Sequence, residues 1–307
     1  MEWFFVAAGL ALLILSGDSL VKGAVNLALR LGVPALIVSL TIVAFGTSAP
    51  ELLISVQSIL DGVPGLALGN VVGSNTANVL LVLGVPALLA VMHTSQCDVR
   101  SSYLQMLAAS VLFIGLCFVG TLNWISGLIL LAGLAAMLGS AVMAARRSPT
   151  EAEVEGADPS MSWVKIILFL GLGLVGLPIG SHLLINGATV IAQNFGLSDS
   201  VIGLTLVAVG TSLPELATTV MAALRRQADV ALGNVIGSNM FNLLGIMGVA
   251  TLVGPVPVDT QFLTFDLWVM LGAALLMVPL VFFRRDITRI WGVGLTGAYA
   301  AYVWTLL

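Results

Sequence analysis

Long apolar runs separated by short polar segments make up almost the whole of this chain. A helix needs roughly 20 apolar residues to cross the hydrocarbon layer of a bilayer. About ten runs of that length recur from end to end, and each predicts a membrane-spanning helix. Their approximate limits are residues 3–29, 34–60, 64–91, 102–120, 123–145, 163–192, 198–224, 229–253, 264–284 and 287–306. The pattern predicts an all-α integral membrane protein.

The composition agrees with a membrane protein and argues against several other classes. The mean hydropathy is +1.11, 59% of the residues are hydrophobic and 8% are charged, which is too apolar for an ordinary soluble domain. The first predicted helix carries Glu2 and no basic segment, so we expect it to be retained rather than cleaved. A net charge of -4 argues against a nucleic-acid surface, and the lack of a GxxxxGKS/T loop argues against an ATP-driven pump. Cys97 and Cys117 lack metal-site or redox spacing and are predicted to be free thiols.

The chain repeats itself at a constant offset. TIVAFGTSAPELL from Thr41 recurs as TLVAVGTSLPELA from Thr205, and ALGNVVGSNTAN from Ala67 recurs as ALGNVIGSNMFN from Ala231. Both repeats are shifted by about 164 positions. We therefore predict two five-helix units, residues 1–145 and 163–307, joined by a polar cytoplasmic linker over residues 146–162.

The basic residues predict the orientation, because lysine and arginine favour cytoplasmic loops. All of them fall in or beside odd-numbered loops between the predicted helices, except Lys22, which lies near the cytoplasmic end of the first helix. The loop residues are Arg30, Arg100, Arg146, Arg147, Lys165, Arg225, Arg226, Arg284, Arg285 and Arg289. Both termini are then expected outside a bacterial plasma membrane. Since five is odd, the two halves are inverted, as in secondary transporters that bind substrate near the midplane.

Each half carries one acid deep within an apolar helix, Glu51 or Glu215. A carboxylate at this depth is costly unless it has a partner, and no basic residue lies at a similar depth, so a cation is the expected partner. The residue before each acid is Pro50 or Pro214, which cannot donate a helical hydrogen bond and so frees backbone carbonyls beside the acid. The alternative, a buried structural hydrogen-bonding group, explains one copy better than two matched copies.

Side chains that bear oxygen surround both acids in the sequence. The hydroxyls before each proline are hard neutral ligands of the kind that sodium and calcium accept. The GSNxxN segment that follows places a serine and an asparagine on one helical face, where its small residues also allow close packing. These candidate residues are Thr47, Ser48, Thr211, Ser212, Ser74, Asn78, Ser238 and Asn242.

The segments GTSAPEL and GTSLPEL, each followed by GNVxGSNxxN, resemble the two alpha-repeats of the calcium/cation antiporter superfamily. The resemblance covers the whole chain and is closest to bacterial and archaeal sodium/calcium exchangers, whose ten helices hold four cation sites. It implies that Glu51 and Glu215 are ligands shared between calcium and sodium. The other implied ligands are calcium-coordinating oxygens of Thr47 and Thr211, two inverted sodium sites from Ala44, Ser48 and Ser74 and from Ala208, Ser212 and Ser238, and the central Asn78 and Asn242.

One position departs from part of this superfamily. Asn242 stands where some archaeal members and the potassium-dependent relatives carry an acid, so potassium coupling is not expected. The two glutamates give the core a charge of about -2, which matches one calcium ion and leaves three sodium ions uncompensated.

Together these features predict a secondary antiporter, not an enzyme, that exchanges sodium for calcium by alternating access, without a cofactor and as a monomer in the bilayer. The resemblance implies that helices one and six slide across the remaining core. A calcium/proton or sodium/proton antiporter remains open, because a buried glutamate can carry protons. A cation channel and a receptor without transport are the rivals from other classes. Asp18 and Lys22 are predicted to form a local pair, and His182 is predicted to be structural.

Overall fold

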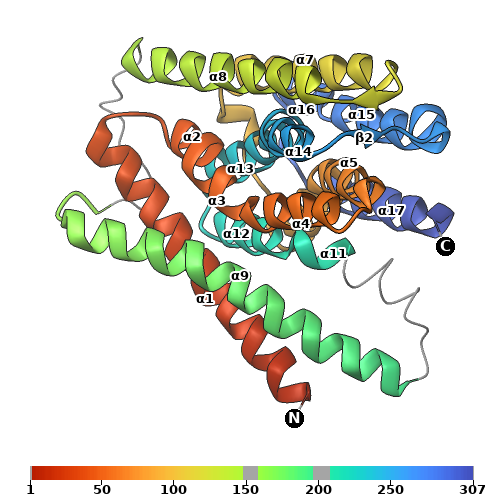
Figure 1. Ribbon diagram of the computed structural model, residues 1–307. Coiled ribbons are helices and arrows are strands. Elements are labelled where there is room, and N and C mark those ends of the chain that lie inside the picture. The colour runs from red at the N-terminus through yellow and green to blue at the C-terminus, as the bar shows by residue number, and fades with distance from the viewer. Residues whose placement is uncertain (1, 148–157, 196–207, 307) are drawn as a thin grey trace.

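The computed structural model describes residues 2–147, 158–195 and 208–306 (Figure 1). Nearly all of them are helical, and the strands among them form one two-stranded pairing. Seven of the described helices are long and apolar enough to cross a bilayer. An eighth candidate span consists of the segments Ala35–Thr47 and Ala49–Leu60, which are bent by 42°. The prediction of an all-α membrane protein with a broken helix is confirmed.

The first predicted unit contains five helical spans close to the predicted limits. The second of these spans is broken, and the third, Pro64–Leu89, ends with a short separate helix. In chain order the elements are α1 (Glu2–Leu31), α2 (Ala35–Val38), the π-helical turn η1 (Ser39–Val43), α3 (Ala44–Thr47), α4 (Ala49–Leu60), α5 (Pro64–Leu80), α6 (Gly84–Leu89), the 3-10 turn η2 (Thr94–Gln96), α7 (Arg100–Cys117), β1 (Thr121–Leu122) and α8 (Trp124–Arg147).

The described long helices of the second predicted unit come in the same order, but its strand precedes the fourth span instead of following it. Positions 198–207 of its predicted broken span, and most of the predicted linker before it, lie outside the described residues. The elements are α9 (Trp163–Asn194), α11 (Ala208–Thr211), α12 (Leu213–Leu224), α13 (Ala228–Met240), the π-helical turn η4 (Phe241–Ile246), α14 (Met247–Val253), β2 (Val256–Pro257), the π-helical turn η5 (Phe262–Asp266), α15 (Leu267–Leu275), α16 (Val278–Phe282) and α17 (Arg289–Leu306).

Local sequence rules account for several helix ends. Gly32 and Gly62 follow α1 and α4 with φ of +65° and +78°, a left-handed backbone that glycine adopts without a steric penalty. Pro64 occupies the first turn of α5, where its missing N–H leaves no helical bond unmade. The side chain of Ser162 caps α9 by accepting a hydrogen bond from the Lys165 amide at 3.4 Å.

The two long helices α1 and α9 form an antiparallel pair beside the other helices (Figure 1). Glycines bring the two backbones close together: a Cβ atom on Gly180 would lie 3.0 Å from the Gly9 carbonyl oxygen, and one on Gly173 would lie 2.8 Å from the Leu20 Cα. Such small residues at a helix contact are typical of membrane proteins, where close backbone approach supplies the packing energy. α1 also packs against α12, so the pair contacts the rest of the molecule on one side.

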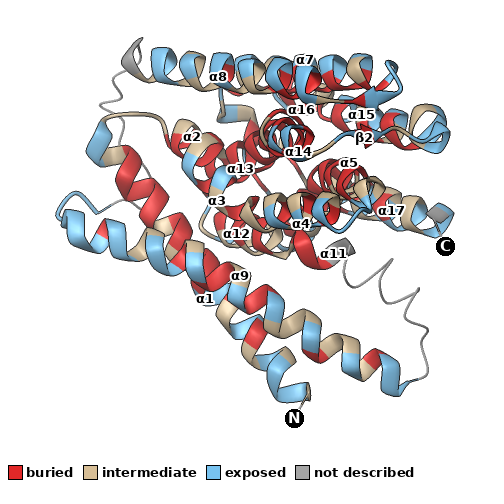
Figure 2. Ribbon diagram, viewed as in Figure 1, coloured by how far each residue is buried: buried red, intermediate tan, exposed pale blue. Residues whose placement is uncertain are grey.

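The centre of the molecule is built from α4, α5, α12 and α13, while α7, α8 and α15 to α17 cover it on the far side from the α1–α9 pair (Figure 2). Every residue of α13 from Val230 to Met240 is buried. The outer faces carry large apolar side chains: Ile290 is 84% exposed and Trp304 is 79% exposed. Such faces suit a bilayer, whose hydrocarbon would cover them.

Two short backbone pairings join the halves at opposite ends. β1 and β2 pair antiparallel, with Leu122 opposite Val256. The Met92 amide donates to the Ile287 carbonyl, and the Ile287 amide donates to the Met92 carbonyl, both at 3.0 Å. Positions 92 and 256 correspond at the repeat offset, and positions 122 and 287 correspond within one residue. We call these two pairings the end clasps.

The basic residues gather near the end that holds the Met92–Ile287 clasp. The Arg30 guanidinium donates to the Met161 carbonyl at 2.6 Å, and the Arg100 guanidinium lies 4.9 Å from the centre of the Phe282 ring. Asp286, beside the clasp, pairs with His93 and accepts from the Ser95 amide, each at 3.0 Å. Although partial burial alone would raise it, these contacts hold the pKa of Asp286 below its usual value.

Both cysteines are free thiols, as predicted. Cys97 lies in the loop before α7, and Cys117 is buried at the end of that helix. Burial, together with the nearby Asp229 carboxylate, raises the pKa of the Cys97 thiol. This thiol is therefore a poor nucleophile near neutral pH.

Candidate cation site

The two broken helices have the same geometry at the break. Ser48 separates α3 from α4 with φ of -85° and ψ of 6°, and Ser212 separates α11 from α12 with φ of -85° and ψ of 2°. Pro50 and Pro214 lie in the first turn of the helix that follows, where the missing N–H is tolerated. The predicted breaks are thus present in both halves.

Glu51 and Glu215 lie in the first turns of α4 and α12, and each is only 1% exposed. The N-terminal end of a helix carries a partial positive charge, which favours a carboxylate at this position. Oε2 of each glutamate has no hydrogen-bond partner among the described residues, and none of the described ion pairs includes either acid. Two buried carboxylates with unused oxygen atoms are suited to bind a cation.

Hydrogen bonds across the halves bring the two acids into one site. The Ser48 hydroxyl donates to Glu215 Oε1 at 3.0 Å. The Thr47 hydroxyl donates to Asn234 Oδ1 at 3.2 Å, so the last turn of α3 faces α13. Thr211 is also buried beside Ser212 at the second break. The hydroxyl groups of one half therefore lie against the acid and the amide of the other.

The serines and asparagines of the GSNxxN helices are buried in the same central region. Ser74, Asn78 and Ser238 are at most 4% exposed, and Asn242 is fully buried. The Asn78 amide donates to Asn239 Oδ1 at 3.0 Å, which links α5 to α13. The buried side-chain oxygens here that have no partner in the described part of the chain belong to Asn75, Asn78, Ser212, Ser238 and Asn242. A cation would satisfy oxygens of this kind, which are costly to bury alone.

Of the two alanines that the resemblance implies, the structure describes the side chain of one. Ala44 begins α3, is fully buried and lies against Gly237, where a Cβ atom would be 2.6 Å from the Ala44 Cβ. Gly237 therefore allows α13 to approach the broken helix closely, next to Ser238. Ala208 begins α11, but its side chain lies outside the described residues.

The structure adds contacts that the sequence analysis did not predict. Asn70 and Asn234, the asparagines of the two GNV segments, donate to the backbone carbonyls of Glu51 and Glu215. Ser181 of α9 donates to the Gly210 carbonyl at 2.7 Å, the carbonyl that Pro214 leaves without its helical donor. The two asparagines could have been identified from the sequence, because the dipeptide GN recurs in both copies. Nothing in the sequence indicates the partner of Ser181.

Asp18 also has a partner that the sequence analysis missed. It pairs with Lys22 at 2.9 Å, as predicted, and in addition with Arg225 at 2.5 Å, which ties α1 to the turn after α12. At the corresponding position in α9, His182 contacts Asn186 at 2.9 Å.

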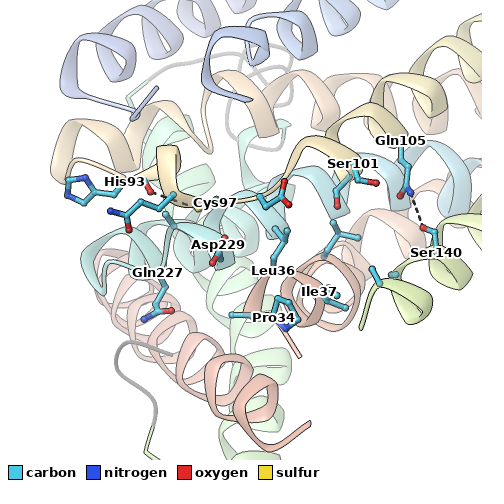
Figure 3. Close-up of a pocket in the computed structure, with 18 of the residues that line it drawn as sticks. Pro34, Leu36, Ile37, His93, Cys97, Ser101, Gln105, Ser140, Gln227 and Asp229 are labelled. Atoms are coloured by element: carbon cyan, nitrogen blue, oxygen red, sulfur yellow. Dashed lines mark hydrogen bonds between the residues drawn. The ribbon is translucent and has the colours of Figure 1, made fainter. Parts of the chain in front are cut away.

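A cavity of about 810 Å³ lies apart from the paired glutamates, near the end where the basic residues gather (Figure 3). Pro34 and Leu36 of the segment at the start of α2 line one wall, and Cys97 and Asp229 line another. Leu40, which also lines it, is one helical turn from Ala44. Because both glutamates are almost completely buried, the cavity stops short of the candidate site.

Comparison with known proteins gives consistent matches over the whole chain. The sequence profile of the family described as sodium/calcium exchanger protein matches residues 1–143 and 165–307. A putative antiporter, CaxA, from Alkalimonas amylolytica is 38% identical, with 98% of this chain and 97% of the relative covered. The sodium/calcium exchanger MaX1 from Methanosarcina acetivorans is 33% identical, with 99% and 97% covered.

The fold also matches that of a solved exchanger. The structure of the sodium-calcium exchanger NCX_Mj soaked with Na⁺ and Ca²⁺ superimposes with a TM-score of 0.86 at 30% sequence identity. The match covers 100% of this chain and 98% of the solved one. This agreement extends to the whole arrangement of helices.

Proposed function

Because the chain belongs to the sodium/calcium exchanger protein family, whose members are cation antiporters, we propose that it exchanges sodium for calcium across a membrane by alternating access. The observation that carries this proposal is the pair of buried glutamates at two matched helix breaks, joined by the Ser48–Glu215 hydrogen bond of 3.0 Å. A single site built from both halves can hold either ion set, so sodium and calcium compete for it.

The proposed ligands are those that the resemblance to the calcium/cation antiporter superfamily implies, and the burial of the described ones around the two breaks supports them. Glu51 and Glu215 serve both ions, because their charges are needed to compensate calcium or sodium. Thr47 and Thr211 add oxygens for calcium. Two inverted sodium sites consist of Ala44, Ser48 and Ser74 and of Ala208, Ser212 and Ser238, with Asn78 and Asn242 between them.

We propose that residues 1–145 and 163–307 are inverted five-helix units, joined by a cytoplasmic linker over residues 146–162. The matched breaks at Ser48 and Ser212 and the matched end clasps support this proposal. The gathering of basic residues at one end supports an orientation with that end in the cytoplasm and both termini outside. The protein acts as a monomer in a bacterial plasma membrane.

The α1–α9 pair is the proposed moving part. Glycines line the contact between α1 and α9. The pair packs against the central helices mainly through α12 and the segments around the two breaks. Sliding of this pair would uncover the shared site first on one side of the membrane and then on the other. Ion loading permits the movement, because it compensates the buried carboxylates.

Proton coupling is the second candidate, and the same two buried glutamates favour it. A carboxylate that is buried and next to a second carboxylate can take up a proton instead of a metal ion. Proton-driven calcium or sodium transport would therefore use the same site. A channel is less consistent with breaks in matched positions, which are typical of alternating access.

The test is calcium-45 uptake into proteoliposomes loaded with sodium, with potassium, or with an imposed pH gradient. Uptake that requires internal sodium supports sodium/calcium exchange, whereas uptake that follows only the pH gradient supports calcium/proton exchange. We expect Glu51→Gln and Glu215→Gln each to reduce uptake at least a hundredfold, because each removes a charge that the ions need.

The matched control is Asp61→Asn, which removes an exposed carboxylate just after α4 and should leave uptake near the wild-type rate. Thermal unfolding in detergent checks that every variant folds. Near-normal uptake by a well-folded Glu51→Gln protein would contradict the site. No uptake by the wild type under either gradient would contradict the transport proposal itself.

A further inference from the structure

Asn234 of α13 contacts three groups around the second helix break, although it is not among the proposed ligands. Its Nδ2 donates to the Glu215 carbonyl at 3.3 Å and to Thr219 Oγ1 at 3.1 Å. Its Oδ1 accepts from the Thr47 hydroxyl of the other half at 3.2 Å. The residue is fully buried, so no solvent competes for these bonds.

Asn70 of α5 makes the matching contacts in the first half. Its Nδ2 donates to the Glu51 carbonyl at 3.2 Å and to Ser55 Oγ at 3.0 Å. These partners correspond to those of Asn234 at the offset of about 164 positions. A pair of hydrogen bonds kept in both copies ties each glutamate-bearing helix to the GSNxxN helix of its own half.

The contacts of Asn234 fix which way its amide group points. A backbone carbonyl can only accept a hydrogen bond, so the group that faces the Glu215 carbonyl must be the amide nitrogen. The amide oxygen must then face Thr47, and an amide oxygen can only accept. The Thr47 hydroxyl is therefore the donor, and its proton points toward Asn234.

A hydroxyl that gives away its proton keeps both lone pairs for a cation. Two other acceptors lie near the Thr47 hydroxyl: the Ala44 carbonyl at 3.3 Å and the Glu215 carboxylate. That carbonyl already accepts from the Ser48 amide at 3.1 Å, so it is partly engaged. A cation bound to the Glu215 carboxylate would repel a proton that points toward it. Asn234 is then the acceptor that lets the Thr47 proton point away from the cation.

We propose that Asn234 is a positioning residue for calcium: it directs the Thr47 proton away from the cation and holds α12, with Glu215, in register with α3 of the other half. Asn70 holds α4 and Glu51 in the same way within the first half. This inference rests on the proposed function, because it assumes that Thr47 and the two glutamates bind calcium. Neither asparagine touches the ion.

Asparagine is the residue type that this position requires. It has two donor hydrogens and an acceptor oxygen on a short side chain, and all three groups find partners here. An aspartate would place a negative oxygen against the Glu215 carbonyl and add a third buried charge. An alanine would leave Thr219 without its donor and would leave the Thr47 proton to the Ala44 carbonyl or to the Glu215 carboxylate, where it competes with the cation.

The experiment measures equilibrium calcium-45 binding to purified wild type, Asn234→Ala, Thr47→Val and the double variant in sodium-free detergent solution. We expect each single change to weaken calcium binding about tenfold, and the double variant to be weakened by less than the product of the two single effects, because the two residues share one hydrogen bond that either change removes. Only Asn234→Ala also removes the bonds to the Glu215 carbonyl and to Thr219, so the double variant should still bind calcium more weakly than Thr47→Val. In a Thr47→Ser background, which keeps the hydroxyl, Asn234→Ala should again weaken binding about tenfold.

The matched control is Asn70→Ala, which does not remove a contact to Thr47, so its effect should add to that of Thr47→Val. Thr251→Val removes a buried hydroxyl that bonds only to its own helix and should leave calcium binding unchanged. Thermal unfolding of each variant separates loss of affinity from loss of folded protein.

The other possible outcomes would overturn either the positioning role of Asn234 or the proposed function. Unchanged calcium affinity in folded Asn234→Ala, or effects of Asn234→Ala and Thr47→Val that simply add, would overturn the positioning role while leaving sodium/calcium exchange intact. A wild-type protein that binds no calcium would overturn the proposed function, and this inference with it.

Discussion

At the scale of single residues, the central charge of the site depends on two asparagines. Asn78 bonds to Asn239, whereas both polar atoms of the fully buried Asn242 lack a partner among the described residues. Among the described residues, the candidate site therefore contains the carboxyl groups of two glutamates and no third acid. This charge balance suits one calcium ion better than several sodium ions.

We expect Asn242→Asp to bind calcium more tightly and to release it more slowly, because a third carboxylate would face the cation in a region of low dielectric. The calcium dissociation constant should fall on the order of tenfold, and the maximal exchange rate should fall with it. Equilibrium binding and initial uptake rates measure the two effects.

The matched control for this prediction is Gln57→Glu, which adds a charge at an exposed position of α4. It should change neither quantity by more than a small factor. If Asn242→Asp binds calcium as the wild type does, position 242 lies outside the site.

The glutamates and the neighbouring hydroxyls could be proposed as site residues from the sequence, because they recur in a fixed local pattern. The partners of these groups could not be predicted, because they depend on which helix faces which. Thr47 meets Asn234 and Asp18 meets Arg225 across separations of 187 and 207 residues, respectively. Helical periodicity gives the face of a residue but not the element that covers it.

At the scale of elements, the prolines allowed the breaks to be predicted but not their local form. The segment from Ala35 to Thr47 contains the π-helical turn η1, and α13 continues into η4. Such turns insert one extra residue into a helical turn and depend on the packing around them. A hydropathy pattern does not distinguish them from an α-helix, so the sequence indicated regular α-helix at these two turns.

The ion pair between Asp18 and Arg225 holds α1 against the turn after α12. We expect Asp18→Asn to loosen this contact and to make the facing surface of α12 more accessible. The rate at which a thiol reagent labels a cysteine at Ala217, which lies against Gly17 of α1, should rise roughly threefold. The labelling is done with Cys97 and Cys117 replaced by serine.

Lys22→Gln is the matched control for Asp18→Asn. Lys22 pairs with Asp18 at 2.9 Å within α1, and no ion pair joins it to another helix in the described part of the chain. Lys22→Gln should therefore leave the labelling rate close to that of the unaltered protein. Equal acceleration by both changes would show that the Asp18–Lys22 pair, rather than the contact of Asp18 with Arg225, sets the rate.

At the scale of the whole molecule, the positive charge predicts which end faces the cytoplasm. In the same cysteine-free background, a cysteine at Asp61 should react with a membrane-impermeant maleimide added to intact cells, because it follows a span that ends outside. A cysteine at Gln96, at the opposite end, should react only after the membrane is opened. The reverse result would invert the orientation and place both termini in the cytoplasm.

The two end clasps bear on how such a chain arises. Each clasp joins a loop of one half to a loop of the other, and the equivalent positions are used at both ends. Two separate copies of a single half, inserted into the membrane in opposite directions, would form both clasps without any covalent connection. The link between the halves would then keep the two copies together in equal numbers. Fused copies are free to diverge from each other: Ser181 stands where the first half has Gly17.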